Sequence, residues 1–200
     1  MIKNIILDFG DIFINLDKPA TARAMVPFGF TGVTPKLDAL FKAYEKGTVS
    51  STVFLEVVSA EFPKASESDL IKAWNAILLE FPDSRLEFVE QLALENQYRL
   101  FLLSNTNDIH IEYVKQTMGL EKYARFKNAF DVFYLSYEMG MRKPDLEIFD
   151  FVLQENHLRP HETLFVDDTK DNTDAASQLG IKTWNLLVGK EDITQLKLHL

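Results

Sequence analysis

Polar residues directly follow several apolar segments of this sequence, and the first of these residues suits nucleophilic attack on a phosphate ester. Asp8 comes directly after the apolar run Ile5–Leu7. An aspartate is ionised at neutral pH, with a reference pKa of about 3.9, so it needs no separate base to act as a nucleophile. Attack on phosphorus would form an aspartyl phosphate, which water can then open. An isolated Asp at such a place is also typical of a turn or a helix N-cap.

Two further groups suit the binding of a phosphoryl group. Ser104 and Asn105 follow the apolar run Leu100–Leu103. A hydroxyl with backbone N–H groups at a strand-to-helix turn is an ordinary site for phosphoryl oxygens. Lys143 precedes Pro144 and supplies a compact positive charge, which would stabilise negative charge on a transferring phosphoryl group. Taken alone, each of these signals is also found in plain turns and at solvated helix ends.

The adjacent residues Asp167 and Asp168 indicate a cation site. They follow the apolar run Leu164–Val166, and neighbouring carboxylates repel each other unless a cation shares the site. Mg²⁺ prefers oxygen ligands and usually takes one or two protein carboxylates, completing its shell with water and substrate. The segment has neither the mid-loop Gly nor the closing Glu of an EF-hand. The sequence therefore favours Mg²⁺ here, with a solvated acidic loop as the alternative.

Composition excludes several functional classes. The chain has 200 residues, 46% of them hydrophobic, enough for one compact core with a small accessory lobe. The net charge of −9 and the lack of a Lys/Arg stripe argue against nucleic acid or an anionic membrane as the main partner. With no cysteine, disulfides and thiolate chemistry are excluded. The four histidines lack metal-ligand spacing and are expected on the surface or at helix ends: His110, His157, His161 and His199.

The apolar run at the N-terminus is too short for a signal peptide or a membrane span, so the cytoplasm is the expected compartment. Further along the chain, apolar runs of strand length alternate with helical patterns, which predicts a parallel sheet covered on both faces. The strands are expected at Ile5–Leu7, Leu100–Leu103, Val132–Leu135, Leu164–Val166 and Thr183–Leu187. Two helix starts are expected, one at a capping box formed by Ser84 and Glu87 and one at Pro144. Gly119 and Gly180 are expected to end helices.

The segment 18–82 breaks this alternation. It has no convincing strand, several helical patterns and four prolines as punctuation. We therefore expect a helical lobe inserted after the first strand, with residues 1–17 and 83–200 forming the sheet unit. Open parallel sheets bind ligands outside the carboxyl ends of their strands. The polar groups described above are expected at that edge. Together they supply a nucleophile, a phosphate-binding group, a positive counter-charge and carboxylate ligands for a metal ion.

These groups give the chain a resemblance to haloacid dehalogenase (HAD) superfamily hydrolases over nearly its whole length. The matching segments, in the family's order, are IILDFGDIF, FLLSNTN, GMRKPD and LFVDDTKDNTDAA. The resemblance implies a Rossmann-like α/β core with a small α-helical cap between the first two motifs, which fits residues 18–82. Within the family, the chain is most similar to small sugar-phosphate phosphatases, such as bacterial glucose-1-phosphate phosphatase, and to the phosphatase domain of soluble epoxide hydrolase.

The resemblance also implies roles for individual residues. Asp8 would be the nucleophile, Ser104 the phosphate binder and Lys143 the charge stabiliser, and we group Asn105 with these catalytic candidates. The expected activity is hydrolysis of a small phosphorylated metabolite, for example a sugar phosphate, through an aspartyl-phosphate intermediate.

The same resemblance implies a metal site. Mg²⁺ would be held by Asp8, Asp168 and the backbone carbonyl of Gly10. Asp167 and Asn172, which complete the pattern D-D-x-x-x-N with Asp168, are expected just behind these ligands.

Gly10 departs from the family pattern. Most family phosphatases carry an Asp two places after the nucleophile, where it protonates the leaving oxygen and then activates water. Losing a positioned general acid costs about a hundred- to ten-thousandfold in rate. A good leaving group, such as that of an anomeric phosphate, would suffer least, and the sugar-phosphate branch also tolerates glycine here. Asp11 is an alternative acid, although its side chain would start from the opposite side of an extended backbone.

Substrate contacts are expected from two places. Tyr44, Glu45 and Lys46 lie between two predicted helices of the lobe, and Asn15 and Asp17 lie at the hinge into it. Each of these side chains is a candidate to touch the organic part of the substrate, the alternative being a solvated helix end.

Other functions remain as alternatives. Metal-independent dehalogenation is disfavoured, since the carboxylate pair Asp167 and Asp168 would repel a carboxylate substrate. The alternative of a catalytically weak phosphate-binding protein is supported by Gly10 alone. A receiver domain would carry its acidic pair on the first strand and would need no helical insert. A dinucleotide-binding motif G-x-G-x-x-G is absent from the first turn.

Overall fold

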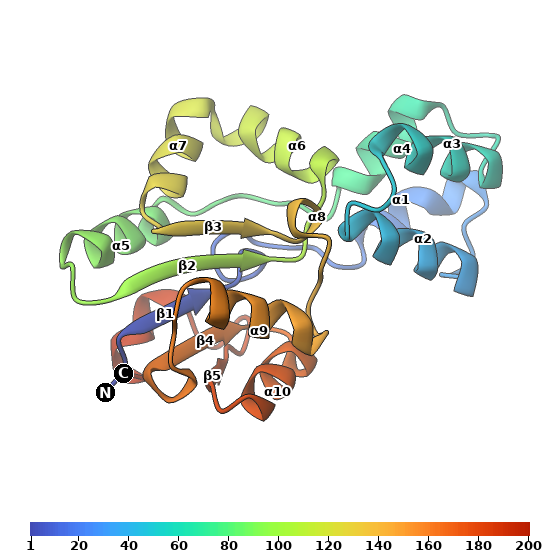
Figure 1. The fold of residues 1–200 in the computed structure, drawn as a ribbon. Helices are drawn as coiled ribbons and strands as arrows, with labels where there is room; N and C mark the ends of the chain where they lie inside the picture. The colour runs from blue at the N-terminus through green and yellow to red at the C-terminus, as the bar shows by residue number, and fades with distance from the viewer.

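A five-stranded parallel sheet lies at the centre of the structure, a computed structural model that describes residues 1–200 (Figure 1). Its strand order is β3-β2-β1-β4-β5, and each neighbouring pair is parallel. This confirms the predicted α/β fold with a Rossmann-like parallel sheet. The predicted strand positions agree with the structure to within two residues. The strands are β1 (Asn4–Leu7), β2 (Arg99–Ser104), β3 (Val132–Leu135), β4 (Thr163–Asp167) and β5 (Lys182–Asn185).

Both faces of the sheet are buried, which explains why its strands are continuous apolar runs rather than alternating ones. In β1, Ile5 and Leu7 belong to one apolar cluster, whereas Ile6 belongs to another. Ile5 lies in register with Leu100 of β2 and Leu164 of β4, so each layer continues across neighbouring strands. Two hydrophobic layers are therefore separated by one sheet.

Helices cover each of these layers. The larger cluster packs under α5 (Asp83–Leu94), α6 (Asp108–Met118), α7 (Leu120–Asn128) and the 3₁₀ helix η3 (Ile193–Leu198). The smaller cluster packs under α9 (Leu146–Glu155) and α10 (Lys170–Gln178), on the opposite face (Figure 1). Two short helices complete this unit, namely α8 (Ser136–Met139) and the 3₁₀ helix η2 (Pro160–Glu162).

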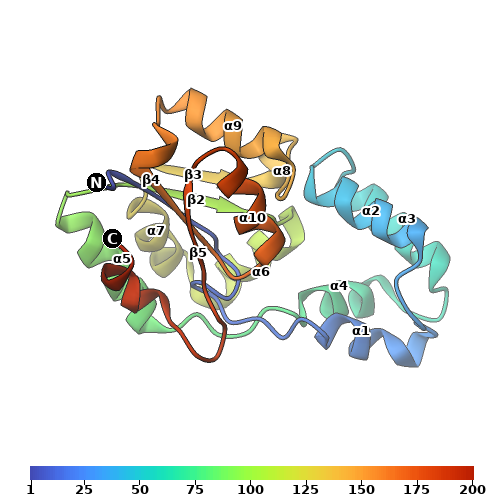
Figure 2. The same cartoon turned by 90° about the horizontal axis from the view of Figure 1, so that it is seen from below.

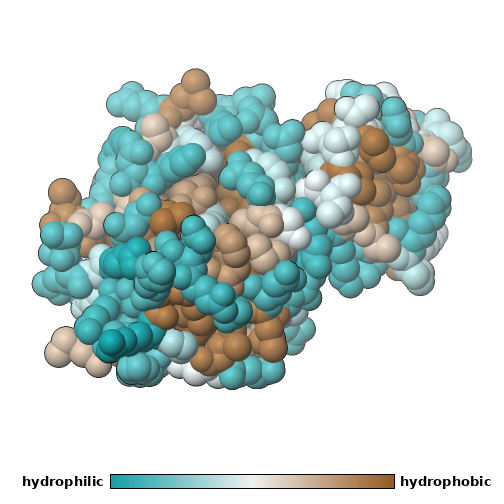
Figure 3. Space-filling view, viewed as in Figure 1, coloured by the Kyte–Doolittle hydropathy of each residue, from teal (hydrophilic) through white to brown (hydrophobic).

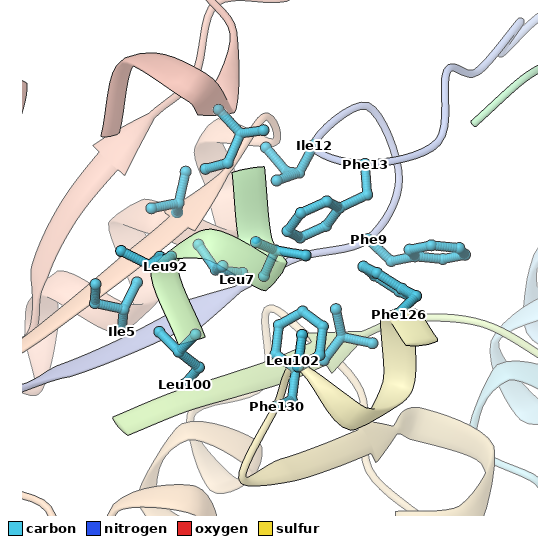
Figure 4. Close-up of a cluster of buried hydrophobic side chains, with 14 of the residues drawn as sticks. Ile5, Leu7, Phe9, Ile12, Phe13, Leu92, Leu100, Leu102, Phe126 and Phe130 are labelled. Atoms are coloured by element: carbon cyan, nitrogen blue, oxygen red, sulfur yellow. The ribbon is translucent and has the colours of Figure 1, made fainter. Parts of the chain in front are cut away.

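Within the larger layer, several aromatic rings pack together among aliphatic side chains (Figure 4). Phe126 of α7 is fully buried. Its ring centroid lies 4.9 Å from that of Phe13, 5.4 Å from that of Phe9 and 5.1 Å from that of Phe130. Such edge-to-face and tilted contacts add to the burial of apolar area. They hold the loop that follows β1 against α7.

Four further helices form a lobe to one side of the sheet (Figures 1 and 2), here called the helical lobe. They are α1 (Ala20–Met25), α2 (Pro35–Glu45), α3 (Ser51–Glu61) and α4 (Glu67–Asn75), with the 3₁₀ helix η1 (Val26–Phe28) after α1. The lobe has its own apolar cluster, which includes Leu37, Phe54 and Leu70. It therefore holds its shape by its own packing.

Two extended segments connect the lobe to the sheet unit (Figure 2). They run antiparallel, and Leu16 on one is bridged to Leu78 on the other. The Asn15 N–H donates to the Glu80 carbonyl, and the Leu79 N–H donates to the Asn15 carbonyl, at 3.0 and 2.9 Å. Backbone pairing thus fixes the path of both connections beside the loop that follows β1.

Two predicted helix starts are wrong by a short distance. The Ser84–Glu87 capping box does not form, because α5 already begins at Asp83, with no side-chain cap and with the Pro82 carbonyl accepting the Arg85 N–H. Pro144 does not open α9, which begins at Leu146. Gly119 and Gly180 do follow the ends of α6 and α10, in left-handed φ of 83° and 81°. No helix of the chain has the length and apolarity needed to cross a membrane.

The aromatic layer predicts a large effect of shortening Phe126. Phe126→Ala should lower the free energy of unfolding by about 3–5 kcal/mol, because it leaves a cavity between the sheet and α7. Denaturant unfolding followed by circular dichroism measures this change. Leu120→Ala, on the same helix at a side chain that is 73% exposed, should stay within about 0.5 kcal/mol of the unmodified protein. Equal losses in the two variants would contradict the assigned packing.

Candidate active site

Three central strands place polar side chains at one edge of the sheet. Asp8 follows β1, Ser104 ends β2 and Asp167 ends β4, and these strands are neighbours in the order β2-β1-β4. This edge faces the helical lobe (Figure 1), and it is where open parallel sheets bind ligands. A cavity of about 750 Å³ lies here. It is lined by seven of the predicted site residues of the sheet unit: Asp8, Gly10, Ser104, Asn105, Lys143, Asp168 and Asn172.

Lys143 lies at the floor of this cavity with its side chain 1% exposed. Its Nζ donates to Asp8 Oδ1, Asp167 Oδ2 and the Leu103 carbonyl oxygen, each at 2.7 Å. All three ammonium donors are therefore used. The arrangement links the segment before α9 to the ends of β1, β2 and β4.

The charges of this group influence one another strongly. Burial raises the pKa of Asp8 to about 7, while the Lys143 ammonium opposes the rise and the Asp167 carboxylate adds to it. Burial opposes the charge on Lys143, but Asp167 and Asp8 outweigh burial and raise the pKa of its ammonium. Lys143 therefore stays charged, and two carboxylates compete for its one positive charge.

Asp167 lies behind the cavity, fully buried, and its carboxylate is saturated with donors. The Thr169 N–H donates to Oδ1 at 2.8 Å, and Asn172 Nδ2 donates to both oxygens at 3.1 and 3.0 Å. Together with the contact from Lys143, these bonds occupy both carboxylate oxygens, so Asp167 serves to orient its neighbours. Asn172 orients Asp167, and Asp167 in turn orients the Lys143 ammonium.

The loop after β2 is fixed from two sides. The Asn105 amide donates to the Lys143 carbonyl at 2.8 Å and accepts the Lys143 N–H at 2.9 Å. The buried Ser136 hydroxyl accepts the Thr106 N–H and donates to the Thr106 carbonyl. Ser104 is 3% exposed and lines the cavity. The Asn105 side chain thus holds the backbone of Lys143.

Carboxylates outnumber ammonium groups at this edge. Carboxylate oxygens of Asp8, Asp167 and Asp168 lie within 4.8 Å of one another. Lys18 Nζ lies 2.5 Å from Asp168 Oδ2 and 3.2 Å from Asp11 Oδ2. Burial raises the pKa of Asp168, Lys18 opposes the rise, and the carboxylates of Asp167 and Asp11 add to it.

This donor set fits a divalent cation. Counted formally, with one negative charge for each of the carboxylates Asp8, Asp11, Asp167 and Asp168 and one positive charge for each of Lys18 and Lys143, the site carries a charge of −2. Hard oxygen ligands with such an excess suit Mg²⁺. Because Asp167 is saturated by other donors, the carboxylates of Asp8 and Asp168 remain to coordinate an ion, and Gly10 lines the same cavity.

Leu16 occupies the space beside Gly10. A Cβ added to Gly10 would lie 2.8 Å from Leu16 Cδ1, so a larger residue requires this side chain to move. Asp11 is not an available replacement acid. It has a left-handed φ of 55°, and its carboxylate accepts the Leu16 N–H at 2.9 Å and contacts Lys18. Asp11 therefore braces the loop after β1 and is absent from the cavity lining.

Two of the five expected substrate contacts line the cavity, namely Glu45 and Lys46 at the end of α2. Tyr44 does not. It is 2% exposed, stacks on Phe54 and bonds through its hydroxyl to Ser51. As an aromatic residue at helical spacing, it belongs to the apolar cluster of the helical lobe.

The two hinge residues also lie outside the cavity lining. The Asn15 side chain donates to Glu80 and accepts from Arg85, and Asp17 forms an ion pair with Arg23. The backbone pairing of the hinge turns these side chains away from the site, whereas the intervening Leu16 lines the cavity.

Sequence reasoning missed several residues of the cavity. Lys18 gave no signal, because a lysine in a proline-containing linker is ordinary. His110 was expected at a surface or helix end. It does lie in the first turn of α6, but it also lines the cavity. Its ring stacks on Trp74 with centroids 5.3 Å apart, and burial lowers the pKa of His110 to about 4, opposed by the Trp74 carbonyl.

Comparisons with known proteins agree with this fold. The family model described as haloacid dehalogenase-like hydrolase matches residues 38–180. A D-ribitol-5-phosphate phosphatase from Bacteroides thetaiotaomicron is 30% identical over 190 residues, covering 92% of this chain and 91% of that relative.

Solved structures extend the similarity. A HAD family enzyme from Bacteroides thetaiotaomicron, solved with magnesium and inorganic phosphate, has a TM-score of 0.80 at 34% identity, covering 96% of this chain and 97% of that one. A HAD-like family hydrolase from Porphyromonas gingivalis has a TM-score of 0.86 at 29% identity, covering 100% and 98% of the two chains. The resemblance to small sugar-phosphate phosphatases is thereby confirmed. The chain belongs to the haloacid dehalogenase-like hydrolase family and is a hydrolytic enzyme.

Proposed function

We propose that this enzyme is a Mg²⁺-dependent phosphatase of small phosphate monoesters. The observation that carries the proposal is the Asp8 carboxylate at the floor of the cavity, 2.7 Å from the buried Lys143 ammonium. A nucleophile beside a fixed positive charge suits transfer of a phosphoryl group, because negative charge on that group is stabilised where it accumulates. The relative named as a phosphatase supports the same chemistry.

Asp8 would attack phosphorus, forming an oxygen–phosphorus bond as the bond between phosphorus and the ester oxygen breaks. The leaving alkoxide would take a proton from water and depart as the alcohol. Water would then attack the aspartyl phosphate, releasing inorganic phosphate and restoring the carboxylate. Lys143 offsets negative charge on the phosphoryl oxygens, and Ser104 supplies a hydroxyl at the end of β2. Asn105, Asp167 and Asn172 act as positioning residues, since their bonds fix the backbone and the ammonium group of Lys143.

Asp8, Asp168 and the Gly10 carbonyl would hold Mg²⁺. The ion supplies positive charge that offsets repulsion between the Asp8 carboxylate and the dianionic phosphate. The Lys18 ammonium contacts Asp168 Oδ2 in this structure. It would have to move away for this oxygen to coordinate the ion. Two observations support the assignment: the formal charge of −2 at the site and a similar enzyme solved with magnesium and phosphate.

The polar cavity favours an uncharged, hydroxyl-bearing organic group, as in a sugar or polyol phosphate. Six of its 25 lining residues are hydrophobic. Its cations near the helical lobe are already paired: Arg142 with Glu45 at 2.9 Å, Lys46 with Asp145 at 2.7 Å, and Lys42 with Asp38. A second phosphate or carboxylate on the substrate would find no free positive charge there. The relative that acts on ribitol 5-phosphate fits this substrate class.

Residues 18–82 would serve as the cap of this site. The ion pairs of Glu45 and Lys46 join the end of α2 to the segment that carries Lys143. On the other side, Trp74 Nε1 donates to Asn107 Oδ1 at 3.2 Å. The helical lobe thus contacts the sheet unit on both sides of the cavity. In this position it would exclude bulk water from the reaction.

Replacing the nucleophile tests the activity directly. Asp8→Asn should lower phosphate release by at least about a thousandfold, because the amide cannot form the covalent intermediate. The assay measures inorganic phosphate from a panel of sugar and polyol phosphates with Mg²⁺. Asp150→Asn makes the same charge change at an exposed site on α9 and should keep full activity. Turnover that survives Asp8→Asn, or its absence from the unmodified enzyme across the panel, would refute the proposal.

Mg²⁺ binding is testable without any substrate. An ion present at a hundred times its dissociation constant should stabilise the fold by about 2.7 kcal/mol. Thermal unfolding with Mg²⁺ and with a chelator measures this shift. Asp168→Asn should lose most of it, because one of the proposed carboxylate ligands is gone, whereas Asp150→Asn should retain it. An unchanged shift in Asp168→Asn would remove Asp168 from the metal site.

The missing acid predicts a dependence on the leaving group. In the Leu16→Ala background, where space beside Gly10 is free, Gly10→Asp should speed hydrolysis of an alkyl phosphate by about a hundredfold. With an aryl phosphate the gain should be small, since a phenolate leaves without protonation. Steady-state kcat values for Leu16→Ala and the double variant provide the comparison. Equal gains on both ester types would show that the new carboxylate does not act as the acid.

A further inference from the structure

The helical lobe contains a second cavity that the proposed chemistry does not use, here called the apolar chamber. Its volume is about 260 Å³, and 11 of its 15 lining residues are hydrophobic. The buried side chains Phe54, Val58 and Leu70 of the lobe's own cluster form part of its wall. Hydrophobic residues also reach the surface of the lobe, at the right of the view in Figure 3.

The apolar chamber adjoins the polar cavity above Asp8. Four residues line both spaces: Lys18, Glu45, Ile77 and His110. Lys18 is a long side chain that is 54% exposed and held only at its tip by carboxylates. The two cavities therefore adjoin each other, and the boundary between them is formed by side chains.

The chamber wall is uncharged away from this boundary. Trp74 contributes an aromatic ring 4.8 Å from Phe54 and 5.0 Å from Phe41, measured between centroids. His110 is neutral because burial lowers its pKa to about 4. Its Nε2 lies 3.1 Å from the Trp74 carbonyl oxygen, and its Nδ1 lies 3.1 Å from the Asn107 amide nitrogen. This pattern requires a proton on Nε2 and none on Nδ1.

The size of the chamber selects among occupants. An apolar protein cavity of about 150 Å³ binds benzene, so 260 Å³ accepts a somewhat larger ring or a short chain. A peptide helix or a folded partner does not fit such a volume. An apolar group in the chamber would gain from leaving water, whereas a sugar there would leave its hydroxyl groups without partners.

We propose that the apolar chamber receives the organic group of a phosphate monoester whose phosphate lies against Asp8 and Lys143. The enzyme's substrates then include esters of apolar alcohols as well as those of sugars and polyols. This inference rests on the phosphatase function proposed above, since the chamber supplies binding only and the phosphoryl transfer is the same.

A homologous series of alkyl phosphates tests the chamber. Ethyl, butyl and hexyl phosphate have leaving alcohols of nearly equal acidity, so differences in kcat/KM between them report binding of the chain. Each methylene that enters the chamber should raise kcat/KM by about fourfold. Hydrolysis of ethyl phosphate with no rise along the series would overturn the chamber proposal while leaving the phosphatase function intact.

Two variants locate the effect. Ala22→Phe adds a ring at a half-buried position of α1 that lines the chamber, so it should flatten the series. Ala60→Phe adds the same ring at an exposed position of α3 that lines neither cavity, and it should keep the slope of the unmodified enzyme. An equal slope in both variants would show that the chain binds elsewhere.

Binding of alkylphosphonates separates this proposal from turnover. Fluorescence of Trp74, in a Trp184→Phe background that leaves it as the sole tryptophan, reports occupation of the chamber by ethyl-, butyl- and hexylphosphonate. The dissociation constant should fall about fourfold per methylene, even if no ester is hydrolysed. Equal affinities for ethyl- and hexylphosphonate would overturn the proposal, whatever the outcome of the activity assays.

Discussion

The site depends on one buried ammonium group. Lys143 joins Asp8, Asp167 and the Leu103 carbonyl, each at 2.7 Å, and so connects three strand ends with the segment before α9. A buried charge is costly unless every donor is satisfied, so the group is either complete or strongly destabilising. This requirement explains the surrounding bonds. Asn105 holds the backbone of Lys143, and Asn172 holds the carboxylate of Asp167.

Satisfying Lys143 leaves an excess of negative charge at the same edge. Asp8 and Asp168 both have raised pKa values, caused first by burial and increased by neighbouring carboxylates. Lys18 offsets part of this charge from the hinge of the helical lobe. The proposed Mg²⁺ would offset the rest, and its binding would release Lys18 from Asp168. Metal binding and the hinge of the lobe would thereby be connected through one side chain.

The helical lobe presents two environments to this centre. Near Lys143, Glu45 and Lys46 form ion pairs with the sheet unit, and the cavity they line is polar. Deeper in the lobe, Trp74 and Phe54 line an apolar chamber. The lobe's own apolar cluster both stabilises it and forms the chamber wall. Selectivity in the proposed reaction then depends on which of the two environments the organic group of the ester enters.

The sheet was predictable from the amino-acid sequence, because strands buried on both faces must be apolar runs such as Leu100–Leu103. The sequence also placed Asp8, Ser104 and Asp167 at strand ends, and a parallel sheet brings such ends together. Their positions after predicted strands were sufficient to expect them at one edge of the sheet, whereas the role of Lys143 was inferred from the family resemblance. Helix starts near Ser84 and Pro144 were missed, since backbone bonds at Pro82 and Arg142 decide them. The packing of the folded chain, in contrast, buries Tyr44 and places Leu16 beside Gly10. It also brings His110 and Lys18 to the cavity. Some of these contacts are local, such as Leu16 beside Gly10, and others join distant segments, such as Lys18 and Asp168. Residue type and spacing do not specify them, because they depend on how loops and helices pack.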